Sequence, residues 1–269
     1  MRGYAIILSI ILSVGSFCRA DYSIIGHPSD FEARVALDAT GPNGDYDPSN
    51  SITNSSLRVG LSGGSNNRVY GNAILFFKLP VLQTNETLTA ANFRVTELAD
   101  PANGPPAINA DLWAIGYDNR TLPANGPLES QSYLFNGPLD PNPGVGAGAT
   151  RSLIQNNFLT PTDVINTGGA PISHDTNPAA DTALLAYIQN LYANPNIIPG
   201  ATSLILRLNY DDATYAPTFG TPVNHYTIAS AENVSNKPTL TLTTQFIPEP
   251  QFITICVSAL LLMSRRLKR

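Results

Sequence analysis

The chain has 269 residues and a formal net charge of −5, and only 13% of its residues are charged. Its 20 glycines and 22 prolines favour many short strands joined by turns over long, charged helices. Residues 21–250 carry nine basic and twenty acidic side chains, a net of −11, and such a surface repels nucleic acid and anionic lipid. This composition argues against nucleic-acid binding and is compatible with neutral glycans, or with anionic glycans bridged by a divalent cation.

The first twenty residues have the parts of a secretory signal peptide. Arg2 supplies the positive charge, an apolar run follows, and Cys18 and Ala20 are small residues suited to cleavage before Asp21. Acylation of Cys18, as in a lipoprotein, is the alternative, although bulky Phe17 precedes it. We therefore predict export, with signal peptidase cutting between Ala20 and Asp21. The other cysteine lies in the C-terminal apolar run, so the exported domain would contain no disulfide.

Alternating apolar and polar residues predict half-buried strands in three segments. These are DFEARVALDA (30–39), SLILRLNY (203–210) and KPTLTLTTQF (237–246). The segment NAILFFKLP (72–80) is apolar on both faces, which predicts a central strand that ends at its proline. Two further strands are expected in TAANFRVTEL (89–98) and INADLWAIGY (108–117).

Two glycine-containing motifs resemble catalytic or cofactor-binding loops. Residues 60–64, GLSGG, match the G-x-S-x-G nucleophile elbow, but the following SNNRVYGN is a poor helix, so a hairpin turn is expected. Residues 144–149, GVGAGA, fit a loose dinucleotide fingerprint but lie among prolines without a βαβ unit, so we expect a loop.

One helix stands out, in PAADTALLAYIQNLYANP (178–195). We expect it to begin with Asp181 as its N-cap and to end before Pro195. The neighbouring TRSLIQNNFL (150–159) is compatible with a helix or a strand. The apolar stripe of the helix consists of Leu184, Leu185, Ile188, Leu191 and Tyr192.

Together these elements predict a mostly β protein of three parts. Residues 21–246 would form a single antiparallel β-sandwich or jelly roll with one or two short helices in a crossover. Residues 1–20 would be the signal helix, and residues 247–269 would contain a hydrophobic C-terminal helix.

Few residues have the spacing of a metal or catalytic site. Oxygen ligands crowd one glycine-rich turn, which makes it a candidate calcium site, with solvated turn carboxylates as the alternative. Asp211 and Asp212 are a second candidate for calcium. The three histidines show no metal spacing, and His225, in the strand-like NHYTIA, is expected to face solvent. The ligands of the proposed calcium turn would be Asp38, Asn43, Asp45 and Asp47.

The C-terminal 22 residues read PEPQFITICVSALLLMSRRLKR and combine a proline motif, an apolar run and basic residues. As a helix, the twelve apolar residues 252–263 would extend about 18 Å, which is short of the roughly 30 Å hydrocarbon core. The basic residues that follow resist translocation, so we predict a temporary hold at the outer face of a membrane. The motif is Pro248, Glu249 and Pro250, and the basic residues are Arg265, Arg266, Lys268 and Arg269.

This ending resembles the PEP-CTERM sorting signal of Gram-negative bacteria. The resemblance implies processing by an exosortase-type membrane protease, in organisms that make extracellular polysaccharide. The apolar run lacks the glycines often found in that family. A plain C-terminal anchor is the alternative.

A second resemblance covers residues 30–244. The segments RVYGNAILFFKLPVLQTNETLTAANFRV (68–95) and ASAENVSNKPTLTLT (229–243) are similar to DNRLRE-type (disaggregatase-related) domains. In that family an exposed acidic segment precedes the last strand. Lys78 stands where the family usually has an aspartate. The resemblance implies a jelly roll of the carbohydrate-binding-module kind.

These observations predict an exported, noncatalytic protein of the cell surface or extracellular matrix that can contact polysaccharide. A polysaccharide lyase or hydrolase on the same scaffold is the first alternative. A protein retained in the membrane by an uncleaved tail is the second. No cofactor is expected, apart from the candidate calcium. Aromatic residues that could form a sugar-stacking platform, although most are expected in the core, are Tyr22, Tyr46, Tyr70, Trp113, Tyr117, Tyr133, Tyr210, Tyr215 and Tyr226.

Overall fold

A computed structural model describes most of the body of the chain. The described residues are 19–38, 41–46, 55–64, 67–98, 109–121, 151–161, 169–210 and 224–247. Only the backbone is described at 31–38, 41–46, 61–64, 67–70, 210 and 224. Residues 1–18 of the predicted signal helix, the C-terminal apolar run and residues 144–149 lie outside these ranges, whereas residues 19 and 20 lie in a strand.

Within the described ranges the chain forms twelve strands and one helix, α2 (Pro178–Tyr192). The strands are β1 (Arg19–Ile25), β2 (Phe31–Asp38), β3 (Gly41–Tyr46), β4 (Ser56–Gly64), β5 (Asn67–Lys78), β6 (Glu86–Glu97), β7 (Ala110–Asp118), β8 (Ser152–Leu159), β9 (Ile172–Asp175), β10 (Ser203–Tyr210), β11 (Asn224–Ala229) and β12 (Thr239–Phe246). The prediction of a mostly β protein with a helix is confirmed.

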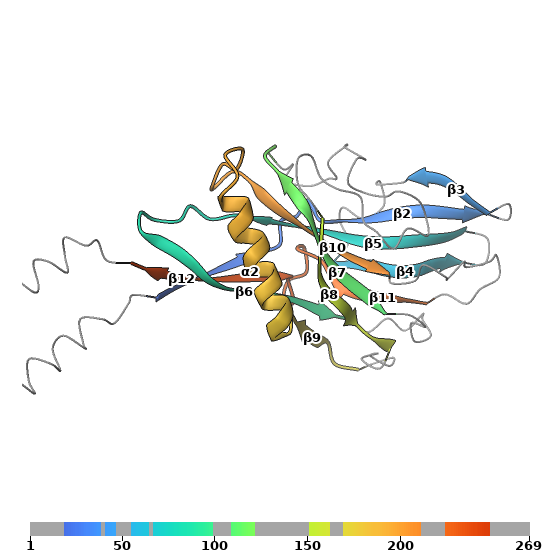
Figure 1. Ribbon diagram of the computed structural model, residues 1–269. Helices are drawn as coiled ribbons and strands as arrows, with labels where there is room; N and C mark the ends of the chain where they lie inside the picture. Colours follow the sequence, from blue (N-terminus) through green and yellow to red (C-terminus); the bar gives the residue numbers. More distant parts are fainter. Residues whose placement is uncertain are drawn as a thin grey trace, which may run out of the picture.

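The strands join into one antiparallel sheet (Figure 1). Its main order is β1-β12-β6-β11-β4-β5-β10-β7-β8, and the remaining strands attach beside it, β2 at β5, β3 at β2 and β9 at β6. The segment at 150–159, for which the sequence allowed a helix or a strand, forms the strand β8. It pairs with β7, and its apolar residues Ile154 and Phe158 are buried. The predicted strands over 30–39, 72–80, 89–98, 108–117, 203–210 and 237–246 are all present.

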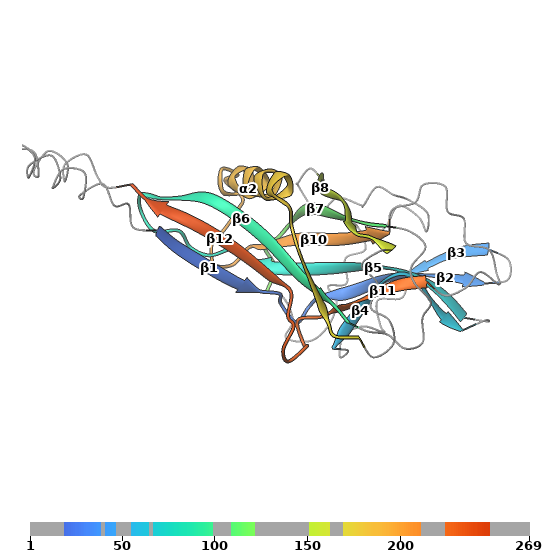
Figure 2. The ribbon, with the colours of Figure 1, turned by 90° about the horizontal axis from the view of Figure 1, so that it is seen from below.

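The sheet curves around a core that it shares with α2. Phe77 of β5 and Phe93 of β6 meet edge to face with ring centroids 5.8 Å apart, although β11 and β4 lie between these strands in the sheet order. Leu184 and Ile188 of α2 are fully buried in the same cluster. The helix therefore lies against the sheet and closes one side of the core, as Figure 2 shows.

β10 differs from the predicted half-buried strand. Leu204, Leu206 and Leu208 face the core as expected, but Ile205 and Arg207 on the opposite face are also fully buried. β10 pairs with β5 on one side and β7 on the other. An internal strand can be covered on both faces, so polar residues in its sequence do not guarantee exposure.

The start of α2 also differs from the prediction. Asn177, not Asp181, is the N-cap, and its side chain accepts a hydrogen bond from the Ala180 amide at 2.9 Å. Pro178 occupies the first turn, where its missing N–H costs nothing. The helix therefore begins earlier than expected, and Asp181 lies in its first turn. Leu184, Ile188 and Leu191 are buried as predicted.

The GLSGG motif lies in β4 and not in a strand-to-helix turn. Residues 60–64 pair with β5, and Gly64 opposes Asn67 where the two strands approach the hairpin connection. A nucleophile elbow requires a helix after the strand, and here another strand follows. The motif therefore belongs to a β-hairpin, but it forms the end of the first strand and not the predicted turn.

The two ends of the described chain lie side by side. β1 pairs antiparallel with β12, so Arg19 opposes Gln245. The amide of Ile247 then donates to the carbonyl of Asn85 at 2.8 Å. In Figures 1 and 2 the start of β1 and the end of β12 therefore leave the sheet at the same end.

Candidate functional site

The predicted sorting residues follow the last described residue directly. Pro248, Glu249, Pro250 and the basic residues 265–269 lie outside the described ranges. Among the described residues, no helix is both long enough and apolar enough to cross a bilayer.

The predicted signal-cleavage bond lies inside β1. Ala20 opposes Thr244, and its carbonyl accepts a hydrogen bond from the Thr244 hydroxyl at 3.2 Å. Asp21 accepts from the Thr243 hydroxyl at 2.7 Å, and this bond lowers the pKa of Asp21. Cleavage at this bond would remove two residues from an edge strand and leave the register from Asp21 onward in place.

The predicted calcium turn is only partly described. Asp38 ends β2 and opposes Gly41 of β3, so the segment is a hairpin at the backbone level. The backbone of Asn43 and Asp45 lies in β3, and Asp47 lies outside the described ranges, as do Asp211 and Asp212. The structure describes none of these side chains, so this site stays a prediction.

His225 does not face solvent as predicted. It lies in β11 between β4 and β6 and is 5% exposed. Tyr226, its neighbour, is fully buried on the core side. Both faces of this strand are covered, which the alternation of polar and apolar residues did not reveal.

The candidate sugar-stacking aromatics divide by burial. Tyr117 and Tyr226 are core residues. Tyr22 is partly exposed, but its hydroxyl donates to the Glu86 carboxylate at 2.9 Å. The side chains of Tyr46, Tyr70 and Tyr210 are not described, and Tyr133 and Tyr215 lie outside the described ranges.

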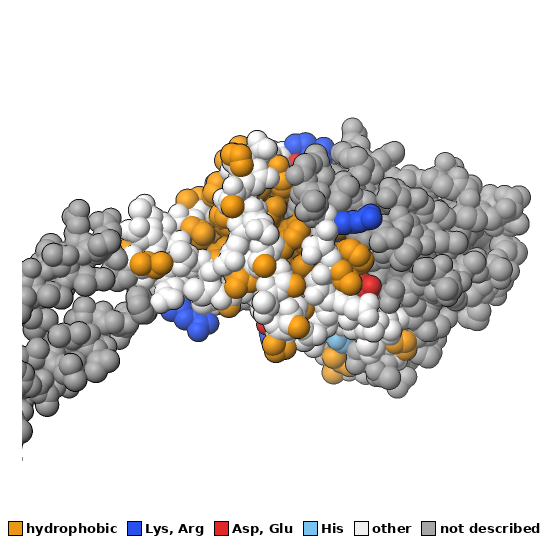
Figure 3. All heavy atoms as spheres, viewed as in Figure 1, with side chains coloured by type: hydrophobic (Ala, Val, Ile, Leu, Met, Phe, Trp, Pro, Cys, Tyr) orange, Lys and Arg blue, Asp and Glu red, His pale blue; other side chains and the backbone are white. Residues whose placement is uncertain are grey.

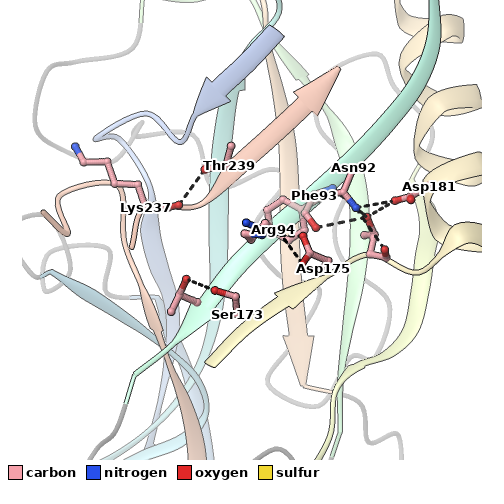
Figure 4. Close-up of polar contacts among 10 residues, drawn as sticks. Asn92, Phe93, Arg94, Ser173, Asp175, Asp181, Lys237 and Thr239 are labelled. Atoms are coloured by element: carbon pink, nitrogen blue, oxygen red, sulfur yellow. Dashed lines mark hydrogen bonds and ion pairs between the residues drawn. The ribbon is translucent and has the colours of Figure 1, made fainter. Parts of the chain in front are cut away.

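A polar network ties β6 to β9 and to the start of α2 (Figure 4). Arg94 forms a two-pronged ion pair with Asp175 of the segment before α2, at 2.8 and 3.0 Å. Asn92 donates to Asp181 at 3.2 Å, and Thr176 donates to the same carboxylate oxygen at 2.5 Å. These side chains satisfy one another, so the network holds the helix against the sheet.

Next to this network, β9 and β6 share a buried acid–imidazole pair. His174 Nε2 lies 3.1 Å from Glu97 Oε2, and the two side chains are 10% and 4% exposed. The Phe158 ring packs against the imidazole. Such a pair can exchange a proton in general acid–base catalysis only if a substrate reaches it; here both side chains are enclosed by the sheet.

A pair of carboxylates, Asp30 and Glu232, joins the turn before β2 to the turn before β12. Asp30 is 1% exposed, and its Oδ2 accepts from the Ala231 amide at 2.7 Å. Asp30 Oδ1 and both carboxylate oxygens of Glu232 are buried without a hydrogen-bond donor in the described structure. Burial raises the pKa of Asp30, and the negative charge of Glu232 raises it further, to about 8.

His27 lies beside this pair. Its Nδ1 accepts from the Ser29 amide at 3.2 Å. Burial lowers the pKa of His27, the Lys78 charge lowers it further, and Glu232 opposes both effects. Across the described residues, no three His, Cys, Asp or Glu side chains converge as a ligand set for a metal.

Sequence reasoning missed both buried pairs. Glu97 and His174 come from strands far apart in the chain, and so do Asp30 and Glu232. No local spacing links them, since only the pairing of β6 with β9 and the closure of the sheet bring them together. In the segment before the last strand, Glu232 is partly exposed, although its carboxylate oxygens are buried.

The chain matches no protein-family model and no curated protein.

Proposed function

We propose that this protein is exported and held briefly at the inner membrane by its tail. An exosortase-type protease then transfers it to the cell surface or extracellular matrix. One observation carries the proposal: the order of proline motif, apolar run and basic residues begins at Pro248, directly after Ile247. Ile247 is the last described residue, and its amide donates to the carbonyl of Asn85, next to β6. A membrane protease that reads the motif would therefore act immediately beside the folded body.

The position of the chain ends supports this arrangement. β1 and β12 are neighbours, so a signal peptide and a C-terminal tail would both emerge from one end of the sheet. The rest of the body would then point away from the membrane during processing.

The test is to follow both ends of the chain in cells that have the protease. One antibody would recognise the folded body and another the peptide 251–269, in membrane, surface and medium fractions. We expect surface protein that carries only the body epitope, and membrane protein that carries both. A P248A/E249A/P250A variant should stay in the membrane with both epitopes. If the wild type also keeps both there, the uncleaved-anchor alternative is correct.

We further propose that the curved sheet is a jelly-roll sandwich that contacts polysaccharide without cleaving it. The contact of Phe77 with Phe93 across non-neighbouring strands supports two facing layers. The helix supports it too, because α2 connects β9, which pairs with β6, to β10, which pairs with β5. The solvent-facing side of α2 is uncharged at Thr182, Ala186 and Gln189. Figure 3 shows few charged side chains on this face, which suits a neutral glycan.

A polysaccharide pull-down of the purified chain, with calcium and with EDTA, tests glycan contact. Incubation with the same polysaccharides, followed by measurement of newly formed chain ends, tests the lyase or hydrolase alternative. Binding without new chain ends supports the proposal. New chain ends that depend on the protein would replace it with the enzyme alternative, and absence of binding to every polysaccharide would leave only the sorting role.

A further inference from the structure

The pair formed by Asp30 and Glu232 is a place where the described structure buries carboxylate oxygens without hydrogen-bond donors. Asp30 lies in the turn between β1 and β2, and Glu232 lies in the turn between β11 and β12. Asp30 accepts a hydrogen bond from the amide of Ala231, the residue directly before Glu232, and this bond brings the two carboxyl groups near each other. Three of their four oxygens meet no donor, and each of the three is buried from solvent.

Buried carboxylates are normally paired, protonated or bound to a metal, because removing an anion from water is costly. The nearest candidate counter-charges in the described structure do not pair with this site. Lys237 acts on Asp30 through its charge, and it donates no hydrogen bond to the buried oxygens of the pair. The His27 ring uses Nδ1 within its own turn, where it accepts from the Ser29 amide.

A single proton shared by the pair satisfies only part of this requirement. It supplies one hydrogen bond between the two groups and leaves one negative charge with a carboxylate oxygen still unpaired. A divalent cation compensates both charges and can contact all three oxygens at once. Two aspartate or glutamate side chains are sufficient when backbone carbonyls and water complete the coordination shell.

We propose that Asp30 and Glu232 bind one divalent cation, and that Ca²⁺ is the preferred ion. Ca²⁺ accepts bidentate carboxylates and irregular geometry, whereas Mg²⁺ keeps several waters and requires a near-octahedral shell. A site in which the carboxylate oxygens are already removed from solvent therefore favours Ca²⁺. The ion links the turn before β2 to the turn before β12, and so closes the early and late parts of the sheet on each other. This site is separate from the Asp38–Asp47 turn.

The experiment uses the purified full chain, freed of metal with EDTA and then titrated with CaCl₂ or MgCl₂ alone. We expect one Ca²⁺ per chain by calorimetry and by metal analysis after gel filtration, with weaker binding of Mg²⁺. Bound Ca²⁺ should also raise the thermal unfolding temperature by several degrees, because a ligand that binds only the folded state stabilises it. No glycan is present, so the result is independent of the proposed function.

Variants decide which carboxylates hold the ion. Asp30→Asn and Glu232→Gln should each weaken Ca²⁺ binding at least tenfold. Glu232 lies in a turn, so Glu232→Gln provides the test if Asp30→Asn does not fold. Glu86→Gln is the matched control, since the Glu86 carboxylate already has its donors, and it should keep full Ca²⁺ binding.

Two results would overturn the proposal. The first is a folded wild-type chain that binds neither Ca²⁺ nor Mg²⁺, which would show that the pair holds a proton alone. The second is Ca²⁺ binding that survives Glu232→Gln and is lost in D38N/D45N/D47N, which would place the ion at the other turn.

Discussion

Arg207 illustrates how a single residue depends on its place in the sheet. Its guanidinium is fully buried and donates to Asn209 at 2.8 Å, two residues further along the same face of β10. A buried arginine is stable only when its N–H groups find acceptors. The second face of β10 buries Ile205, Arg207 and Asn209 together, so a charged residue in a strand is not by itself a sign of solvent exposure.

At Gly200, both the backbone conformation and the surrounding space disfavour a side chain. Its φ is +81°, and a Cβ there would lie 2.9 Å from Val81 Cγ2. We predict that Gly200→Ala lowers the free energy of unfolding by about 1–2 kcal/mol, measured by urea denaturation.

Gly26 provides the matched control. A Cβ there meets its neighbours at ordinary distances of 3.5–3.6 Å, and its φ lies outside the left-handed region. Gly26→Ala should change stability far less than Gly200→Ala. Equal losses at both positions would show that strain at Gly200 is not the cause.

At the scale of elements, the start of α2 is determined by side chains that compete to cap it. Asn177 accepts from the Ala180 amide, while Asp181 is taken up by Asn92 and Thr176. The cap therefore lies one turn earlier than the acidic residue suggests. The helix is held by its cap, its apolar stripe and its link to β6.

Removing that cap should weaken the helix. We predict that Asn177→Ala costs about 1 kcal/mol of unfolding free energy, whereas Asn177→Asp costs much less because aspartate also caps well. Chemical denaturation followed by circular dichroism measures both. Indistinguishable stabilities for the two variants would mean that packing against β6 alone determines where α2 starts.

The end of the β1–β12–β6 segment depends on an ionised carboxylate. Glu86 accepts hydrogen bonds from the Thr244 hydroxyl, the Gln83 amide and the Tyr22 hydroxyl, and these lower its pKa. A lowered folded-state pKa means that the unfolded chain binds the proton more readily, so the stabilisation is present at neutral pH. It is lost as the pH falls through the acid range below about 4.

We accordingly predict that Glu86→Gln destabilises the protein by about 1 kcal/mol at pH 7, and that the difference from wild type shrinks below pH 4. Urea unfolding at pH 7, 5 and 3.5 measures this dependence. A difference that stays constant over the whole range would contradict a role for the Glu86 charge.

At the scale of the whole molecule, the predicted cleavage between Ala20 and Asp21 removes the first two residues of β1. Arg19 and Asp21 form an ion pair at 3.5 Å, with side chains 68% and 57% exposed, and such exposed pairs contribute little. Arg19 also donates to the Thr243 hydroxyl, and the Ala20 carbonyl accepts from the Thr244 hydroxyl. The pairs from Asp21–Thr243 to Ile25–Thr239 remain.

We predict that chains starting at residue 19 and at residue 21 fold alike, with unfolding free energies within about 1 kcal/mol of each other. Denaturation of the two purified chains checks this, and N-terminal sequencing of the exported protein identifies the natural start. A chain that requires Arg19 and Ala20 to fold would argue for a cleavage site further upstream.

The positions of most strands and of the helix could be predicted from the sequence. Alternation identified strands such as β2 and β12, the apolar run at 72–80 identified the central strand β5, and the stripe containing Leu184 and Ile188 identified α2. These features could be predicted because each arises from a periodicity within a few neighbouring residues.

Which polar residues are buried, and which of them contact one another, depends on how the strands are arranged in the folded chain. Arg207 and His225 are buried even though they alternate with core residues along their strands, and Asp30 meets Glu232 because the turns before β2 and β12 close on each other. Sequence separation carries no information about such contacts, since strand order is determined by the packing of the whole core. The candidate cation site arises from that closure, whereas the proposed sorting signal lies in the last 22 residues of the sequence.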